Sequence, residues 1–234
     1  MRKRYPAAVA AATLLALAVI PAARADIFWN GDASGGTAVF GNLDCAGPGS
    51  VITAAGSTGH GTIFRFTKPA GDIRCESRGI RVDGDRYAFE PDADYWFGWQ
   101  SQLSTVSGDF VVWQWKSYPN AEQNYPLIMT VKDGSVRFFY VAPDATGWTL
   151  LWSTPIRAGE WNSFAVGVHT SASATAGWAE LYFNGVEQVR VTGRTWDSAN
   201  EPKWGVYDRD DGSTEVINRI DSLRSGTSFS DLNP

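Results

Sequence analysis

The residue types best suited to chemistry occur in three short motifs, and the first is Arg74-Cys75-Glu76-Ser77-Arg78. In an extended strand, the side chains of Arg74, Glu76 and Arg78 point to one face and those of Cys75 and Ser77 to the other. Two guanidinium groups beside one carboxylate can bind an anionic ligand. The same pattern also fits a solvated strand face with cross-strand ion pairs.

Two further motifs add hydrogen-bond donors, cations and a phenol. Gln114 and Lys116 share one face of an otherwise apolar strand, where polar side chains either have partners or line a groove. Lys203, Gly205 and Tyr207 alternate in the same way, and the glycine leaves space for a close approach to the backbone. If one sheet face gathers the three motifs, they form a basic groove of the kind an anionic polymer requires.

Strands must position these motifs, because helical periodicity is nearly absent after the N-terminal segment. Tight turns with Asn or Asp before Gly are expected at 132–134, 183–185 and 211–212. Alternating side chains predict strands at 61–66, 95–100, 110–116, 127–131, 136–141, 163–169, 179–184 and 217–223. We therefore expect an all-β, two-sheet jelly-roll sandwich of the concanavalin or lectin-like type, with a concave groove. Nothing divides residues 26–234, which are predicted to form a single domain.

The first 25 residues have the organisation of a secretory signal peptide. Residues 1–4 are positively charged, residues 7–20 are apolar, and Ala-Arg-Ala at 23–25 provides a cleavage site. The apolar run is shorter than the roughly 20 residues needed to span a bilayer. We expect the segment 1–25 to be removed and the protein to be secreted into the extracellular space.

The charge balance excludes several classes of partner. The chain has 20 Lys+Arg and 25 Asp+Glu, and because residues 1–25 carry four basic and no acidic side chains, the remainder has a net charge of −9. Nucleic-acid binding needs a surplus of basic residues, and membrane-surface binding needs a basic amphipathic helix. We expect neither partner. An anionic ligand must be held by a local basic site against an adverse global field.

Cys45 and Cys75 are the only cysteines and fit the prediction of export. In an oxidising compartment such a pair is expected to form one disulfide. The bridge closes a loop of about 30 residues and contributes about 3–4 kcal/mol by the chain-entropy estimate. Metal ligation by these thiols is disfavoured because no CxxC motif or histidine cluster accompanies them.

Other catalytic classes find little support in the sequence. There are only two histidines, His60 and His169, and no G-x-S-x-G or phosphate-loop motif. The 11 Trp residues fit packing in a core or on a sheet face. Exposed on a concave face, the same rings would stack on sugars. The excess of Trp in a small secreted β-protein therefore favours a carbohydrate partner.

The ordered trio of motifs resembles the groove motifs R-x-E-x-R, Q-x-[HK] and K-x-G-x-Y of jelly-roll polysaccharide lyases. Alginate lyases, heparin lyase I-like enzymes and endo-β-1,4-glucuronan lyases of polysaccharide lyase family 20 share this pattern. Residues 113–119, 124–134, 161–185 and 201–207 most resemble the glucuronan lyases. One position departs from the alginate lyase pattern, because Lys116 stands where those enzymes usually have a histidine.

The resemblance implies cleavage of a 4-linked polyuronate by β-elimination. The C6 carboxylate must be neutralised, a base must remove the C5 proton, and an acid must protonate the departing O4. Gln114, Lys116 and one of Arg74 or Arg78 suit the first task, because donors aimed at a developing enolate stabilise it. Tyr207 is the candidate for both proton transfers, since adjacent cations favour a phenolate.

His60 remains the alternative base, with Tyr207 then left as the acid. The residues expected to bind the substrate are Arg74, Glu76, Arg78 and Lys203. The resemblance also implies a structural calcium ion, for which Asp221 and oxygens near residues 26–32 are candidate ligands. We expect no organic cofactor and a monomeric protein.

Three alternatives to a glucuronan lyase stay open. The first is a lyase acting on alginate or a heparin-type polymer. The second is a non-catalytic carbohydrate-binding module on the same fold, which has no chemical need for the pair Lys203 and Tyr207. The third is a glycosidase, which requires two carboxylates such as Glu76 and Asp208. Two flanking arginines would keep Glu76 ionised, which argues against the third.

Overall fold

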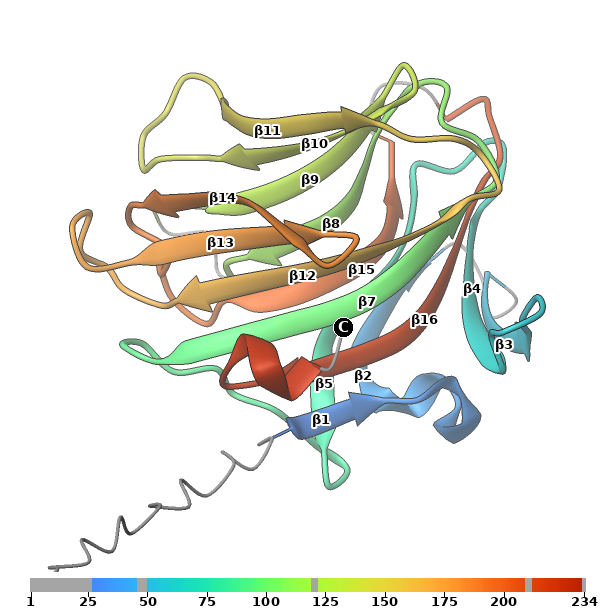
Figure 1. The fold of residues 1–234 in the computed structure, drawn as a ribbon, viewed down its shortest axis with the longest axis horizontal. Helices are drawn as coiled ribbons and strands as arrows, with labels where there is room; N and C mark the ends of the chain where they lie inside the picture. Colours follow the sequence, from blue (N-terminus) through green and yellow to red (C-terminus); the bar gives the residue numbers. More distant parts are fainter. Residues whose placement is uncertain (1–26, 46–49, 119–121, 209–211, 233–234) are drawn as a thin grey trace, which may run out of the picture.

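The computed structural model describes residues 27–45, 50–118, 122–208 and 212–232, so the predicted signal peptide lies outside the described residues. Two antiparallel sheets pack face to face over these ranges (Figure 1). The first sheet contains β1 (Ile27–Gly31), β3 (Val51–Ala55), β4 (Thr62–Lys68), β7 (Asp94–Leu103), β12 (Trp161–His169), β13 (Trp178–Phe183), β14 (Val186–Thr192) and β16 (Val216–Gly226). The second contains β2 (Phe40–Cys45), β5 (Arg74–Val82), β6 (Asp85–Arg86), β8 (Asp109–Lys116), β9 (Leu127–Lys132), β10 (Ser135–Tyr140), β11 (Thr149–Pro155) and β15 (Glu201–Tyr207). The predicted all-β sandwich is confirmed.

The strand order brings distant parts of the chain together. The first sheet runs β14-β13-β12-β7-β16-β4-β3, with β1 paired to β16. The second sheet runs β11-β10-β9-β8-β15-β5-β2, with β6 paired to β5. In this second sheet the late strand β15 is inserted between β5 and β8, which carry the first two motifs. All three motifs are therefore on neighbouring strands.

Tight turns close the hairpins where the sequence predicts them. Asp133 and Gly134 join β9 to β10 with φ of 48° and 82°, and Asn184 and Gly185 join β13 to β14 with φ of 49° and 77°. Two successive positive φ angles are the conformation of the type I′ turn, whose twist matches that of the flanking strands. Part of the third predicted turn, residue 211, lies outside the described residues.

An aromatic core fills the space between the sheets. Trp113, Trp115 and Trp204 from the second sheet have no exposed surface, and Trp99 and Phe97 face them from the first. Trp99 stacks on Trp113 with ring centroids 5.7 Å apart. Most of the buried Trp residues thus serve packing, and their alternation leaves the intervening residues of β8 and β15 on the opposite face of the second sheet.

The predicted disulfide between Cys45 and Cys75 is present and joins β2 to β5. The short 3-10 helix η3 (Phe229–Leu232) covers the outer face of the first sheet, where Leu232 packs over Gly98. The part of the chain that the structure describes contains no helix long and apolar enough to cross a membrane.

Candidate functional site

The site is built on the three adjacent strands β5, β15 and β8. Gly205 lies opposite Glu76, and Tyr207 lies opposite Arg74. On the other side of β15, Lys203 lies opposite Gln114. Because cross-strand partners project to the same face, this register gathers the three motifs on the outer surface of the second sheet.

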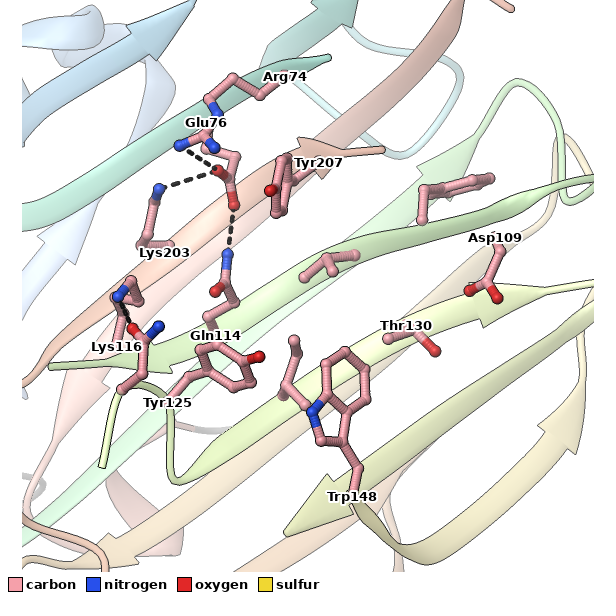
Figure 2. Close-up of a pocket in the computed structure, with 14 residues that line it drawn as sticks. Arg74, Glu76, Asp109, Gln114, Lys116, Tyr125, Thr130, Trp148, Lys203 and Tyr207 are labelled. Carbon is pink, nitrogen blue, oxygen red and sulfur yellow. Dashed lines mark hydrogen bonds and ion pairs between the residues drawn. The ribbon is translucent and has the colours of Figure 1, made fainter. Parts of the chain in front are cut away.

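A groove of about 430 Å³ runs over this surface (Figure 2). Six predicted site residues line it: Arg74, Glu76, Gln114, Lys116, Lys203 and Tyr207. The remaining lining residues come from β8, β9 and the segments that precede β9 and β11: Asp109, Phe110, Val111, Asn124, Tyr125, Ile128, Thr130 and Trp148.

Glu76 is the centre of a buried polar cluster on the groove floor. Its side chain is only 3% exposed, and its Oε1 accepts a hydrogen bond of 2.7 Å from Gln114 Nε2. Its Oε2 lies 2.9 Å from Lys203 Nζ and 4.0 Å from the Arg74 guanidinium. These contacts set the positions of the three groups that surround the carboxylate.

Lys203 is charged despite its burial. Burial alone would lower the pKa of its ammonium group, but the nearby carboxylates of Glu76 and Asp44, together with Tyr118, outweigh burial and raise the pKa. Lys203 Nζ also donates to Asp44 Oδ2 over 3.2 Å. Because its ammonium group contacts both carboxylates, Lys203 on β15 links the side chains of Asp44 on β2 and Glu76 on β5 at the groove floor.

Lys116 is a cation whose charge is easily lost. Burial, and next the positive charge of Lys203, lower its pKa to about 8. Its Nζ donates to the side-chain Oδ1 of Asn124 and to the carbonyl of Ser117. The ring of Tyr118 lies 4.9 Å from the ammonium group. Lys116 therefore presents a charge at the groove wall that is sensitive to pH just above neutrality.

Tyr207 stands at the end of β15 under the guanidinium of Arg74, whose Cζ lies 4.3 Å from the ring centroid. A bulge in the pairing of β15 with β8 sets Tyr207 opposite Val111. Gly205 has φ of +141°, and a Cβ there would lie 2.2 Å from the Cys75 carbonyl oxygen. The space left by this glycine is thus filled by β5, which approaches the backbone closely.

The sequence model of the polysaccharide lyase family matches residues 28–224, which is most of the chain and includes every strand of the groove. The chain belongs to the polysaccharide lyase family. No curated protein sequence matches this lyase.

Solved structures share the fold of this lyase at low sequence identity. The endo-β-1,4-glucuronan lyase of the fungus Trichoderma reesei superposes with a TM-score of 0.64 at 14% identity, over 82% of this chain and 93% of that one. The alginate lyase Aly36B gives 0.60 at 12% identity, over 86% and 94%. The family 7 alginate lyase A1-II′ gives 0.57 at 15% identity, over 75% and 81%.

Arg78 does not line the groove of the lyase, although its motif predicted a substrate contact. Its Nε lies 3.2 Å from Glu201 Oε2, and its Cζ lies 3.4 Å from the ring centroid of Tyr118. Glu201 also pairs with Arg86 at 2.5 Å. The predicted placement of Glu76 between two arginines is corrected accordingly: Arg74 is beside it, whereas Arg78 pairs with Glu201.

His60 lies outside the groove, which corrects the expectation that it serves as the base there. Its Nδ1 is 2.7 Å from Asp221 Oδ2 on β16, and its ring stacks on Trp161 of β12 at 3.9 Å. Both partners belong to the first sheet, whereas the groove lies on the second. His169, the second histidine, pairs with Asp94 on the first sheet.

Asp221 lines a shallow hollow together with Asn30 and Asp32, in the region where the resemblance implies calcium. Carboxylate and amide oxygens are donors suited to Ca²⁺. However, Asp221 Oδ2 contacts His60, its Oδ1 accepts from the backbone N–H of Ser222, and Arg224 also lines the hollow. The described residues include no group of three or more His, Cys, Asp or Glu arranged for a metal. Calcium stays a prediction.

Several groove residues were not identified from the sequence. Asn124 and Tyr125 precede β9, and Trp148 precedes β11, so none of them belongs to an alternating strand motif. Asp44, which holds Lys203, comes from β2, a strand that the sequence pattern did not predict. Asp208, considered as a glycosidase carboxylate, is buried and does not line the groove.

Proposed function

We propose that this polysaccharide lyase is secreted and cuts a 4-linked polyuronate internally by β-elimination, with β-1,4-glucuronan as the preferred substrate. The observation that carries the proposal is the gathering of Arg74, Gln114, Lys116 and Tyr207 in one groove of an otherwise acidic protein. The fold shared with a glucuronan lyase and with alginate lyases supports it. The predicted signal peptide supports secretion.

The first requirement of the reaction is neutralisation of the uronate carboxylate. Arg74 and Lys116 supply positive charge, and Gln114 supplies an amide group at the groove floor. Glu76 orients Gln114 through the 2.7 Å hydrogen bond, so the amide does not have to reorganise when the enolate forms. Glu76 and Lys203 bind no substrate charge, because they pair with each other at 2.9 Å and both side chains are buried, whereas the Arg74 side chain is partly exposed.

The second requirement is proton transfer, which we assign to Tyr207. As a phenolate it takes the C5 proton, the electron pair of that bond forms the C4–C5 double bond, and the bond from C4 to O4 breaks. The phenol then gives the proton to O4. In a 4-linked glucuronate the C5 proton and O4 leave from the same side of the ring, so one tyrosine can serve both steps. The position of His60 on the other sheet leaves Tyr207 without a competing groove histidine among the described residues.

The experiment is a screen of the purified protein without residues 1–25 against glucuronan, alginate and heparin. Unsaturated products absorb in the ultraviolet, and a rapid fall in viscosity identifies internal cutting. We expect glucuronan to be cut fastest. Faster cutting of alginate or heparin would replace the proposed substrate, whereas retention in affinity gels without any unsaturated product would favour a carbohydrate-binding module.

The matched variant is Tyr207→Phe, which removes only the phenolic oxygen. We expect it to lose at least about a thousandfold in turnover, since proton transfer by a positioned group contributes about 10²–10⁴-fold to each step. Polymer binding should remain. Tyr125→Phe is the control, because that ring also lines the groove but has no assigned proton transfer. Undiminished turnover of Tyr207→Phe would refute the assignment.

A further inference from the structure

Trp148 is an exposed aromatic side chain in the wall of the groove. It is 44% exposed, and among the described residues the other large apolar side chains of similar exposure, such as Leu150 and Val186, do not line the groove. An exposed apolar side chain is ordinary on a protein surface. An indole in the wall of a groove that must hold a polysaccharide is in a position to touch the ligand.

Two neighbouring rings hold Trp148 in place. Its indole makes an edge contact with Tyr125 at 5.6 Å and with Phe139 at 5.5 Å between ring centroids. Phe139 comes from β10 and Tyr125 from the segment before β9, so three separate parts of the chain build the cluster. Edge-to-face contacts of this kind fix the ring plane. The indole is therefore pre-organised and does not lose rotamer freedom when a ligand binds.

The cluster lies away from Arg74 and Tyr207 in the groove. Arg74 and Tyr207 are on β5 and β15, whereas Trp148 directly precedes β11, and β8, β9 and β10 lie between. With neighbouring strands about 4.8 Å apart, β15 and β11 are separated by roughly 19 Å. Figure 2 shows Trp148 on the far side of Tyr125 from Glu76 and Lys203. A polymer that fills the groove thus meets Arg74 and Tyr207 in one part and the aromatic surface in another, where the ammonium group of Lys116 lies 5.9 Å from the ring centroid of Tyr125.

We propose that Trp148 is the stacking platform of a separate sugar subsite, which binds the apolar face of a ring away from the bond that is cut. The proposal rests on the proposed lyase function. It identifies the part of the groove that would distinguish a long polymer from a short oligomer. The part of the groove with Arg74 recognises the carboxylate. The aromatic part recognises the ring, whatever its charge, and favours long substrates over short ones.

The test compares Trp148→Ala with wild type on polymeric glucuronan and on its short oligomers. Because an aromatic contact of this kind contributes up to about 1.5 kcal/mol, we expect KM for the polymer to rise roughly tenfold. We expect kcat to change less than about twofold, since the platform lies away from the reacting atoms. KM for the shortest cleavable oligomers should not change. Trp148→Phe should recover most of the affinity.

Salt separates stacking from charge. Stacking is not screened, so the ratio of KM values between Trp148→Ala and wild type should stay the same from about 0.05 to about 0.5 M NaCl. The ratio for Arg74→Ala should shrink over the same range. The control Leu150→Ala removes an exposed apolar side chain two residues away that does not line the groove, and it should match wild type.

The proposal is overturned if Trp148→Ala has the KM of wild type, or if Leu150→Ala shows the same rise. A failure of the proposed function would give a different result from a failure of the platform. A wild-type protein that produces no unsaturated ends from any uronan would overturn the lyase assignment, and the platform with it. Normal cutting by both wild type and Trp148→Ala with equal KM overturns the platform alone.

Discussion

Lys203 Nζ lies 2.9 Å from Glu76 Oε2, and each side chain has no more than 3% of its surface exposed. The two side chains lie in the groove floor and neutralise each other, so the cations of the groove lining outside this pair are Arg74 and Lys116. This arrangement explains how an acidic protein could bind the acidic polymer that we propose as its substrate. The protein needs only a small surplus of cations at one place, because a groove focuses the field of the charges that line it.

Breaking the buried pair is expected to destabilise the fold strongly. Lys203→Met leaves Glu76 buried opposite an apolar side chain, and loss of one partner of such a pair costs about 3–5 kcal/mol. The double variant Lys203→Met with Glu76→Gln removes both charges and should recover most of that loss in urea unfolding. Additive losses in the two single variants and the double variant would show that the pair is not coupled.

Activity should fall on the alkaline side as Lys116 loses its proton. Its pKa is lowered to about 8, so its positive charge is present at neutral pH and disappears as the pH rises through 8. We expect KM for polyuronate to rise above that pH. Lys116→Arg keeps the charge and should move the alkaline limb upward by more than one pH unit. If the alkaline limb of the pH profile is unchanged in Lys116→Arg, the loss of activity at high pH belongs to another titrating group.

The same shift has a consequence for stability with the opposite sign. Between about pH 8 and the ordinary lysine value of 10.5, the unfolded chain holds the Lys116 proton and the folded chain does not. Folding therefore gains stability from this group as the pH rises through that window. Thermal unfolding of wild type and Lys116→Met at pH 7.5 and 9.5 measures the effect, and we expect the gain only in wild type.

Asp197 anchors the segment that carries Asn124 and Tyr125 into the groove. Although its burial favours the neutral acid, hydrogen bonds from the backbone N–H groups of Glu122 and Gln123, together with Ser117 and Arg194, lower the pKa of Asp197. Asp197→Asn should cost about 2 kcal/mol, the size of hydrogen bonds to a charged group. It should also raise KM, because Lys116 loses the fixed position of its Asn124 partner.

The pH dependence of this contribution follows from the lowered pKa. The stabilisation is present above the ordinary Asp value of 3.8 and is lost as the pH falls through the lower folded value. Acid unfolding of wild type and Asp197→Asn should therefore converge below that range. Curves that stay parallel down to the lowest pH would contradict the assignment. Asp85→Asn, at an exposed position on β6, is the control.

The disulfide is expected to stabilise the groove strand β5 as well as the fold. Replacing Cys45 and Cys75 with Ala should lower the free energy of unfolding by about 3–4 kcal/mol, from the loss of a loop of about 30 residues. Turnover at 25 °C should remain close to wild type, since the bridge points away from the groove into the core. A variant that is as stable as wild type would show that the pairing of β2 with β5 alone suffices.

Calcium is tested through stability. If Asp221, Asn30 and Asp32 contribute to a calcium site, saturating Ca²⁺ at about 100 times its Kd adds about 2.7 kcal/mol, and EDTA lowers Tm. Asp221→Asn should abolish the difference and leave the groove unaffected, because this hollow lies on the first sheet. Equal Tm values in Ca²⁺ and EDTA would refute the predicted calcium site.

The sequence pattern predicted the strands that face both core and solvent, because alternation is strongest there. It located β4, β7, β8, β9, β10, β12, β13 and β16 correctly to within a few residues. It did not predict β11 and β14, whose residues are mostly half-exposed and mix polar and apolar types on both faces. β11 and β14 are the outermost strands of their sheets, so each pairs with a neighbour on one side only. An edge strand of this kind places few constraints on which residue types it contains.

The strand motifs could be predicted to converge, but their partners could not. Arg74, Gln114 and Tyr207 occupy alternating positions, and such positions show which face a side chain takes. Whether the Arg78 side chain lines the groove or pairs with Glu201 depends on which strands are neighbours and on their register. Trp148 lies at the junction of a connection and an edge strand, where no periodicity constrains its direction.

The insertion of β15 between β5 and β8 also determines when the site can exist. β15 spans residues 201–207, so the groove floor is incomplete in any chain that ends before residue 201, however well the earlier strands have paired. Contacts of such long sequence separation form late and slowly. A chain that stops short of β15 is therefore expected to be inactive, because β15 carries both Lys203 and Tyr207.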